Sequence, residues 1–161
     1  MRSLLLLILF TLSLSAIEII NPLQKHIYKV GETVLDFKLK SQYKKTYKFS
    51  DKTQYIFITY DKLSTRLQNI FITKRPHFLH YTQSMLLVDT SVIPGAIFYF
   101  FVNPKMRRIP LPLLYSDDIN FSKMFPYKEN HISIMKLKNK VVEEIIFVKS
   151  EKELQELFEV L

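Results

Sequence analysis

The chain has 161 residues, a mass of 19.2 kDa and a formal net charge of +8 at pH 7. This length fits one domain, with or without a targeting segment, and leaves no room for a second. Hydrophobic residues make up 48% and charged residues 24%, a balance that favours a packed core over intrinsic disorder. Because the sequence has 0 cysteines and only 2 glycines, it excludes a disulfide framework, a thiolate metal site, a cysteine nucleophile and a glycine-rich phosphate loop.

The N-terminus has the pattern of a secretory signal peptide. Arg2 precedes an apolar run over residues 4–14, and the small residues Ser15 and Ala16 follow it. A run of this length is shorter than the roughly 20 residues that cross a membrane as a helix. We therefore predict a signal peptide over 1–16, a lead-in over 17–28, one domain over 29–161 and a periplasmic location. Two alternatives stay open: a buried N-terminal element, or an uncleaved segment that anchors the protein in the inner membrane.

The positive charge is spread along the chain, mostly as lysine. Loss of Arg2 with the signal peptide lowers the net charge from +8 to +7. This spacing is typical of solvated strand and loop faces, so solubility is the simplest interpretation. An anionic envelope component is the functional alternative, whereas an exported protein is not expected to meet nucleic acid.

The first elements expected along the chain are a β-hairpin and a central strand. Leu35, Phe37 and Leu39 alternate with polar residues, which predicts a half-buried strand. A polar turn over 41–45 then leads into a second strand over 46–49. The continuous apolar run over 54–60 predicts a strand that is covered on both faces.

A helix and a second buried strand follow. The helix is predicted over 61–72, because apolar residues recur there at helical spacing (Leu63, Leu67, Ile70 and Phe71). The buried strand is predicted over 84–89. It ends in Asp89, Thr90 and Ser91, which have the side chains of a helix N-cap.

The segment over 96–102 is ambiguous. Its aromatic residues favour a strand. Two parallel strands need a crossover, however, and a further strand candidate follows over 109–115, so we predict a buried helix over 96–102. Lys105, Arg107 and Arg108 then lie at the C-terminal end of this helix, where its dipole favours cations, and contact with anionic lipid is the alternative interpretation. Pro110 and Pro112 would lie at the entrance of the last strand or force it to an edge.

The C-terminal third predicts an antiparallel hairpin and a helix. The strands lie over 131–137 and 141–148, joined by a short turn in which Asn139 accepts a positive φ. Ser150 and Glu153 form a capping box that begins a helix. Its buried stripe repeats at helical spacing (Leu154, Leu157, Phe158 and Leu161).

This order of elements resembles the thioredoxin-like superfamily, in the version with an N-terminal hairpin. The resemblance covers residues 29–161 and rests on that order, on the lead-in from Gly31 to Leu39 and on the hairpin before the terminal helix. It implies an α/β, three-layer fold with a mixed central sheet. In redox-active members a cysteine pair opens the helix after the first central strand, where this chain has residues 63–66 without a thiol. Disulfide exchange and peroxide chemistry therefore do not carry over.

A closer resemblance is to the YtfJ-like exported proteins, which also lack cysteine in the mature chain. It rests on the stretch from Asp89 to Gly95, followed by an apolar segment, a basic patch and a further strand. One departure concerns the cis-proline that precedes the hairpin in the superfamily, because the nearest proline, Pro126, lies six positions before Ile132.

Histidine and aspartate side chains supply the candidates for metal chemistry. His77 and His80 are spaced to share one helix face, and Asp117 and Asp118 follow the strand over 109–115, so these four residues are the candidates for a metal-dependent hydrolase. Turn formation by the two aspartates and surface exposure of the histidines are the simpler interpretations.

The sequence therefore predicts a non-enzymatic binding or accessory protein of the cell envelope, without a cofactor, whose partner is an envelope protein or an anionic envelope component. The alternatives are the metal-dependent hydrolase and a membrane-anchored structural protein. We expect partner contact at the ends of the central strands, through Tyr60, Leu63, Ser64, Thr65, Arg66, Ile93, Pro94 and Gly95.

Overall fold

The computed structural model describes residues 26–158, so the predicted signal peptide and most of the lead-in lie outside the described residues. The elements in chain order are β1 (Lys38–Ser41), β2 (Thr46–Lys48), β3 (Tyr55–Thr59), α1 (Lys62–Thr73), α2 (Phe78–Tyr81), β4 (Ser84–Asp89), α3 (Gly95–Ile97), the π-helical turn η1 (Phe98–Val102), α4 (Asn103–Met106), β5 (Leu114–Ser116), α5 (Ile119–Ser122), β6 (Ile132–Lys138), β7 (Val141–Val148) and α6 (Glu151–Phe158). Within this part of the chain, no helix is both long enough and apolar enough to span a membrane.

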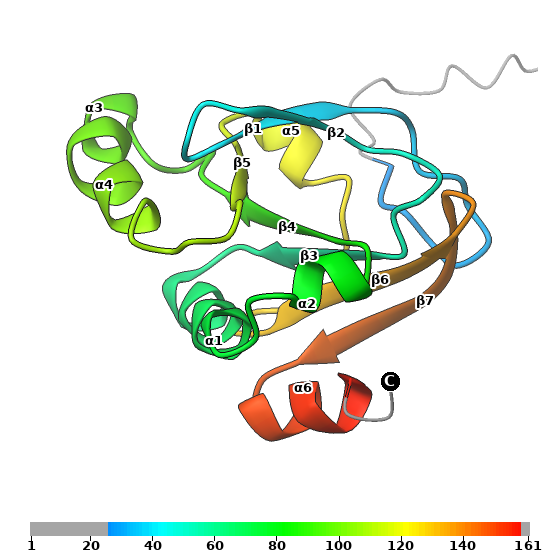
Figure 1. The fold of residues 1–161 in the computed structure, drawn as a ribbon. Coiled ribbons are helices and arrows are strands. Elements are labelled where there is room, and N and C mark those ends of the chain that lie inside the picture. The colour runs from blue at the N-terminus through cyan, green and yellow to red at the C-terminus, as the bar shows by residue number, and fades with distance from the viewer. Residues whose placement is uncertain (1–25, 159–161) are drawn as a thin grey trace, which may run out of the picture.

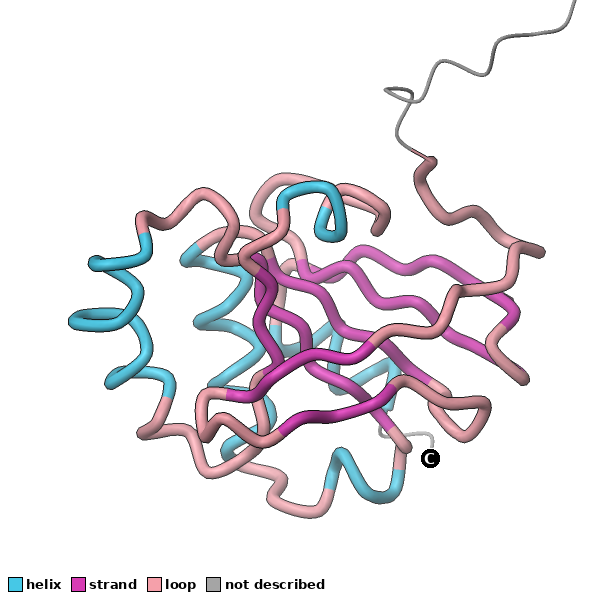
Figure 2. Tube along the Cα trace, turned by 90° about the horizontal axis from the view of Figure 1, so that it is seen from above, coloured by secondary structure: helices cyan, strands magenta, loops and turns pink. Residues whose placement is uncertain are grey.

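The seven strands form one mixed sheet in the order β2-β1-β5-β4-β3-β6-β7 (Figure 1). The central strands β3, β4 and β5 are parallel, whereas β1 is antiparallel to β5 and β6 is antiparallel to β3. Figure 2 shows the strands side by side in the middle of the molecule with the helices around them. The predicted α/β fold with a mixed sheet and an N-terminal hairpin is confirmed.

Two apolar cores lie on opposite faces of the sheet. Phe57 of β3 faces the core that contains α1, α2, α6 and the helical segment from α3 to α4. Ile56 and Ile58 face the other core, which is closed by the segment around Tyr28 and by Phe125, just after α5. Because successive residues of a strand point to opposite faces, the continuous apolar run in β3 is explained by burial on both sides.

The C-terminal hairpin and helix form as the sequence predicts over residues 132–158, whereas the predicted stripe residue Leu161 lies outside the described residues. Asn139 and Lys140 form the two-residue turn between β6 and β7 with φ of 50° and 68°, the conformation that suits a tight hairpin. Before α6, the Glu153 N–H donates to Ser150 Oγ at 3.2 Å, and the Glu153 carboxylate accepts from the Lys149 N–H at 2.8 Å. This backbone hydrogen bond lowers the pKa of Glu153. In the usual capping box this carboxylate accepts from the N–H of the N-cap residue, here Ser150, whereas in this protein it accepts from the N–H one residue earlier.

The strand predicted over 109–115 is wrong in its extent, because β5 covers only Leu114–Ser116. Pro110 and Pro112 have no N–H to donate to a neighbouring strand, so the chain before β5 does not pair as a strand. The predicted strand over 35–39 is also displaced, since β1 covers Lys38–Ser41. The short helices α2 and α5 were not predicted, since each has only 4 residues and no helical repeat.

Gln42 holds the chain before β5 in place. Its side-chain amide donates to the carbonyl oxygens of Ile109 at 3.2 Å and Leu111 at 2.8 Å, and its Oε1 accepts from the Leu113 N–H at 2.8 Å. The side chain is buried. Gln42 therefore supplies the hydrogen bonds that a regular strand would otherwise provide in this segment.

Candidate functional site

A groove with a volume of about 980 Å³ opens at the C-terminal ends of β3 and β4. One wall is α1, with Thr65, Arg66 and Ile70, and the opposite wall is the helical segment from α3 to α4, with Ile97 and Phe101. Most of its surface is apolar. The carboxyl ends of parallel strands are the usual place for ligands in open α/β sheets, and this volume is at the upper end of the range for small-molecule sites.

Asp61 fixes the wall formed by α1. It is the N-cap of that helix, and its Oδ1 accepts from the Ser64 N–H at 2.8 Å. Its Oδ2 accepts from the Asn130 N–H at 3.1 Å, two residues before β6 begins. Asp61 therefore joins the start of α1 to the loop before the C-terminal hairpin, and both of its oxygens are occupied.

Asp89 occupies the equivalent place at the end of β4. Its Oδ1 accepts from the Ser91 N–H at 2.9 Å and from Ser122 Oγ at 2.7 Å. The prediction that residues 89–91 cap the next helix is wrong, because α3 begins only at Gly95 with Pro94 as its N-cap residue. Asp89 instead closes a loop and connects it to α5.

Tyr60 lies between these two carboxylates at the floor of the groove. Its hydroxyl donates to the carbonyl oxygens of Ser122 and Phe125, each at 3.0 Å. Burial, with a smaller effect from the negative charge of Asp89, raises the pKa of Tyr60 well above its usual range. The hydroxyl is thus neutral and held by backbone acceptors, so it orients the floor of the site and offers no base.

The second wall is a helix, as predicted, but the expectation that it is buried is wrong. Only Phe98 and Met106 of this segment are fully buried, whereas Phe100 is 75% exposed and Phe101 is 64% exposed. Pro104 has no N–H, and just before it the Asn103 N–H reaches back five residues to the Phe98 carbonyl oxygen. This π-helical turn accommodates the proline without ending the helix.

Side chains of the helical segment from α3 to α4 point in three directions. Phe98 packs on Tyr115 of β5, with ring centroids 4.7 Å apart, and so attaches the helix to the sheet. Ile97, Phe101 and Lys105 recur every four residues and line the groove. Tyr99 and Phe100 do not line the groove and project into solvent.

The rim of the groove is cationic. Lys62, Arg66 and Lys105 are exposed, and none of them forms an ion pair with any residue in 26–158. The acidic residues on its lining, Asp61 and Asp89, accept the backbone and hydroxyl hydrogen bonds described above. An apolar molecule with a negative group at one end matches this combination of lining and rim.

The residues predicted for partner contact divide between the groove and its surroundings. Tyr60, Thr65, Arg66 and Ile93 line the groove. Leu63 is exposed outside it and Ser64 is buried beneath the first turn of α1. Pro94 and Gly95 are exposed at the start of the second wall. Partner contact by these residues stays a prediction.

Ile97 and Phe101 line the groove but were not predicted from the sequence as site residues. The apolar run that contains them was visible, but its aromatic content favoured burial. The only available signal was the spacing of Ile97, Phe101 and Lys105 on one face of the predicted helix.

The residues proposed for metal chemistry do not come together. His80 lies on the short helix α2 and His77 directly precedes it, and both are exposed. Asp118 is the N-cap of α5, where its Oδ1 accepts from the Asn120 N–H at 2.8 Å. No group of three or more acidic or histidine side chains suited to a metal ion is found among residues 26–158.

Neither a protein-family model nor a curated protein sequence matches this chain. Its structure, in contrast, is similar to many solved structures. A candidate protein disulfide isomerase from Bacteroides thetaiotaomicron superposes with a TM-score of 0.55 and 16% identity, over 84% of this chain and 89% of that one. The chain has a thioredoxin-like fold.

Two further structures show the same fold. Peroxidoxin BcpB from Mycobacterium tuberculosis gives a TM-score of 0.52 at 13% identity, over 80% of this chain and 94% of that one. A candidate thioredoxin from Neisseria meningitidis gives 0.52 at 17% identity, over 79% and 88%. At such identities the likeness establishes the fold and leaves the activity open.

The residues at two positions of the thioredoxin-like fold, that of the cysteine pair and that of the proline before the hairpin, can be identified in this structure. The four residues that the resemblance places at the cysteine pair, Leu63 to Arg66, lie in the first turns of α1 directly after β3. The peptide bonds of residues 26–158 are all trans, including the one before Pro126. Two residues before β6, the chain has Asn130, with φ of 59° and its N–H bound to Asp61.

Proposed function

We propose that this protein is an exported binding protein of the cell envelope, without thiol chemistry, which holds an apolar ligand with an anionic group in the groove between α1 and the α3–α4 segment. The groove is the observation that carries the proposal. Its lining supplies apolar surface, and Lys62, Arg66 and Lys105 supply positive charge without an acidic partner in the described part of the chain. Binding would bury the exposed ring of Phe101 and the side chain of Ile97.

Two features of the sequence support the export and the absence of redox activity in this proposal. The charge and apolar pattern of residues 1–16 favours a secretory signal. The absence of cysteine removes the thiolate on which disulfide exchange depends. The resemblance to the YtfJ-like exported proteins agrees with both. In an exported protein that has no thiol in the stretch from Leu63 to Arg66, the groove is the main functional surface.

The test uses dodecanoate, a single apolar chain with one carboxylate, kept below its micellar concentration. Isothermal titration calorimetry on the protein is expected to give saturable binding of one molecule per chain. Phe101→Glu removes apolar contact and adds repulsion, so we expect an affinity loss of at least about tenfold.

The matched control is Phe100→Glu, which changes the neighbouring exposed ring outside the groove. This variant is expected to bind dodecanoate as the unmodified protein does. Equal losses in the two variants, or no saturable binding to the unmodified protein, would overturn the proposed site.

A further inference from the structure

Two segments without an acidic residue lie next to each other in the fold. They are residues 37–50, which include the β1–β2 hairpin, and residues 90–116, which run from the end of β4 through β5. Their eight basic residues are Lys38, Lys40, Lys44, Lys45, Lys48, Lys105, Arg107 and Arg108. Because the chain has 23 basic and 15 acidic residues, the remaining sequence holds 15 of each and is neutral. These two segments therefore carry a formal charge of +8, equal to the net charge of the whole chain, while residues 62–88 are a further acid-free segment with four basic residues.

The two acid-free segments lie against each other although they are far apart in the sequence. β1 pairs with β5 in antiparallel register, with Lys40 opposite Tyr115. The Tyr43 hydroxyl, in the turn after β1, donates to the carbonyl oxygens of Arg107 at 3.2 Å and Ile109 at 2.7 Å. Arg107 Nε donates to the Gln42 carbonyl oxygen at 3.1 Å. The turn of the hairpin and the end of α4 are thus one connected surface.

The strand lysines share a sheet face with the α3–α4 segment. Residues that are directly opposite on paired strands point to the same face. Lys38 is opposite Lys48, and Lys40 is opposite Tyr115, whose ring packs on Phe98. All eight cations are exposed, and none forms an ion pair with a residue in 26–158. Lys45 lies over the Tyr47 ring, 5.4 Å from its centroid, on the opposite face of the hairpin. We call the surface formed by the other seven cations the acid-free face.

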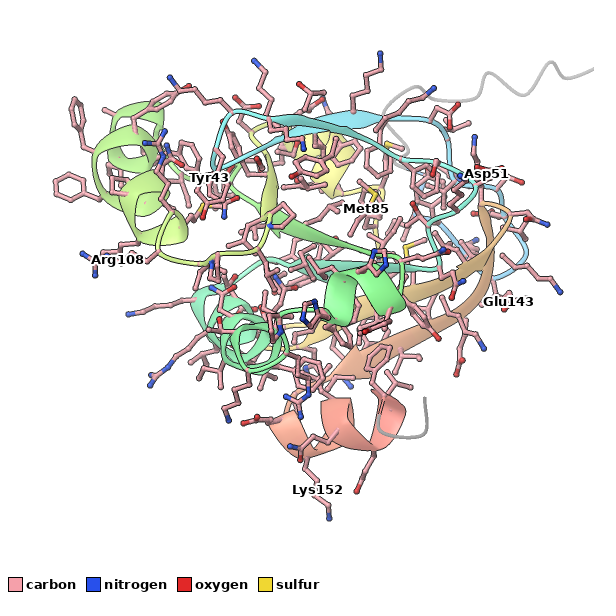
Figure 3. The ribbon with its side chains drawn as sticks, in the orientation of Figure 1. Tyr43, Asp51, Met85, Arg108, Glu143 and Lys152 are labelled. Carbon is pink, nitrogen blue, oxygen red and sulfur yellow. The ribbon has the colours of Figure 1, made fainter. Side chains whose placement is uncertain are left out.

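Exposed aromatic rings stand beside these charges. Tyr99 is 62% exposed and Phe100 is 75% exposed, on the side of the helix that faces away from the groove. Figure 3 shows nitrogen-tipped side chains over the hairpin, Arg108 projecting from the end of α4, and aromatic rings projecting from the same helical segment away from the sheet. Large rings with this exposure are unfavourable in water and favourable at the boundary between lipid headgroups and acyl chains.

We propose that the acid-free face docks on an anionic lipid membrane surface, with Phe100 and Tyr99 inserted at the headgroup boundary and its seven cations above the lipid phosphates. Positive charge alone would fit any polyanion. The two exposed rings favour lipid, because a membrane interface buries their apolar surface while the basic residues remain in contact with negative charge. The surface shares Lys105 with the groove, and the variants that test the two proposals leave Lys105 unchanged, so membrane docking and ligand binding are tested independently.

The experiment is co-sedimentation with vesicles of phosphatidylglycerol and phosphatidylcholine, with pure phosphatidylcholine vesicles as the reference. The unmodified protein and all variants are purified from the same expression host, so that they carry the same N-terminus and differ only in the substituted residues. The triple variant Lys44→Glu/Lys48→Glu/Arg108→Glu reverses three charges on the face. Since each surface cation contributes roughly a fivefold increase in binding, we expect the partition onto anionic vesicles to fall at least about 100-fold.

The matched control is Lys29→Glu/Lys123→Glu/Lys138→Glu, which makes the same change in net charge with exposed lysines outside the face. It is expected to lower the partition far less. Equal losses in the two triple variants would overturn the proposal, because net charge alone would then explain binding.

The aromatic contribution is tested by Phe100→Ser in the same assay and on immobilised heparin. We expect about a tenfold loss on anionic vesicles and unchanged retention on heparin. If Phe100→Ser leaves vesicle binding unchanged, the face is a general polyanion-binding surface and the lipid proposal is wrong. Absence of any preference for anionic over neutral vesicles would also contradict it.

Discussion

Tyr60 connects the end of β3 to the far side of the sheet. Its hydroxyl reaches the carbonyl oxygens of Ser122 and Phe125, and its ring contacts Tyr127 edge to face, with centroids 5.1 Å apart. One side chain therefore positions both the floor of the groove and the segment after α5. The neutral hydroxyl is required for this, because only the protonated form can donate to a carbonyl oxygen.

Tyr60→Phe is expected to destabilise the protein by about 1 kcal/mol at about pH 8, since it removes the hydrogen bond to buried acceptors. The pKa of Tyr60 is raised in the folded protein, so above the ordinary value of 10.0 the unfolded chain releases this proton while the folded chain keeps it. Stability of the unmodified protein therefore falls as the pH rises past that value. Urea denaturation should show the difference between the two proteins shrinking from about pH 9 to about pH 11.

The exposed Tyr81, which is 78% exposed, gives the control for this measurement. Tyr81→Phe is expected to leave both the stability and its pH profile unchanged. A constant difference between the unmodified protein and Tyr60→Phe across this range would contradict the assigned role of Tyr60.

At the scale of single elements, two buried glutamines behave in opposite ways. Gln42 satisfies its amide on the carbonyl oxygens of the segment before β5 and on the Leu113 N–H. Gln68 lies on the buried side of α1, and neither its Nε2 nor its Oε1 has a hydrogen-bond partner among residues 26–158. A buried amide without partners costs free energy, whereas a satisfied one organises the chain around it.

Replacement of each glutamine by methionine, which has a similar shape, tests this contrast. Gln68→Met is expected to raise the free energy of unfolding by about 1 kcal/mol, because it removes two unsatisfied groups from α1. Gln42→Met is expected to lower it by about 3 kcal/mol, because it leaves several backbone groups unpaired. Thermal or urea denaturation measures both, and a loss of stability in Gln68→Met would show that its amide is satisfied in solution.

The same elements show how far the sequence predicts the structure. The strands at β3, β4, β6 and β7 and the helices α1 and α6 follow from local apolar spacing and from caps such as Ser150, because their stabilising residues are neighbours in the chain. The segment around η1 could be predicted as a helix from the need for a crossover. Its exposure could not, because an aromatic run has the same appearance whether it is buried or lines an open groove.

Polar contacts between residues far apart in the chain could not be predicted from the sequence either. Gln42 bonds residues 67 to 71 positions away, and Asp61 bonds Asn130 across 69 positions. Such partners are determined by the assembled sheet and have no local pattern. Half of the residues predicted for partner contact line the groove. Ile97 and Phe101 could not be predicted to line it, because the sequence does not show which side of the helical segment from α3 to α4 faces α1.

At the scale of the whole molecule, the segment from α3 to α4 separates two surfaces. Its side toward α1 closes the groove with Ile97 and Phe101, and its opposite side carries Tyr99 and Phe100 beside the acid-free face. A thioredoxin-like sheet supports both, while the position of the cysteine pair is taken by a helix start that Asp61 caps. We infer that the fold serves here as a scaffold for binding.

The most direct test of this account is an NMR titration of isotopically labelled protein with dodecanoate. The account predicts that amide shifts change in a saturable manner along α1 and along residues 88–109, while the β6–β7 hairpin and α6 remain unaffected. Shift changes concentrated at the hairpin or α6, or no change at any ligand concentration below the micellar limit, would contradict the groove as the binding site.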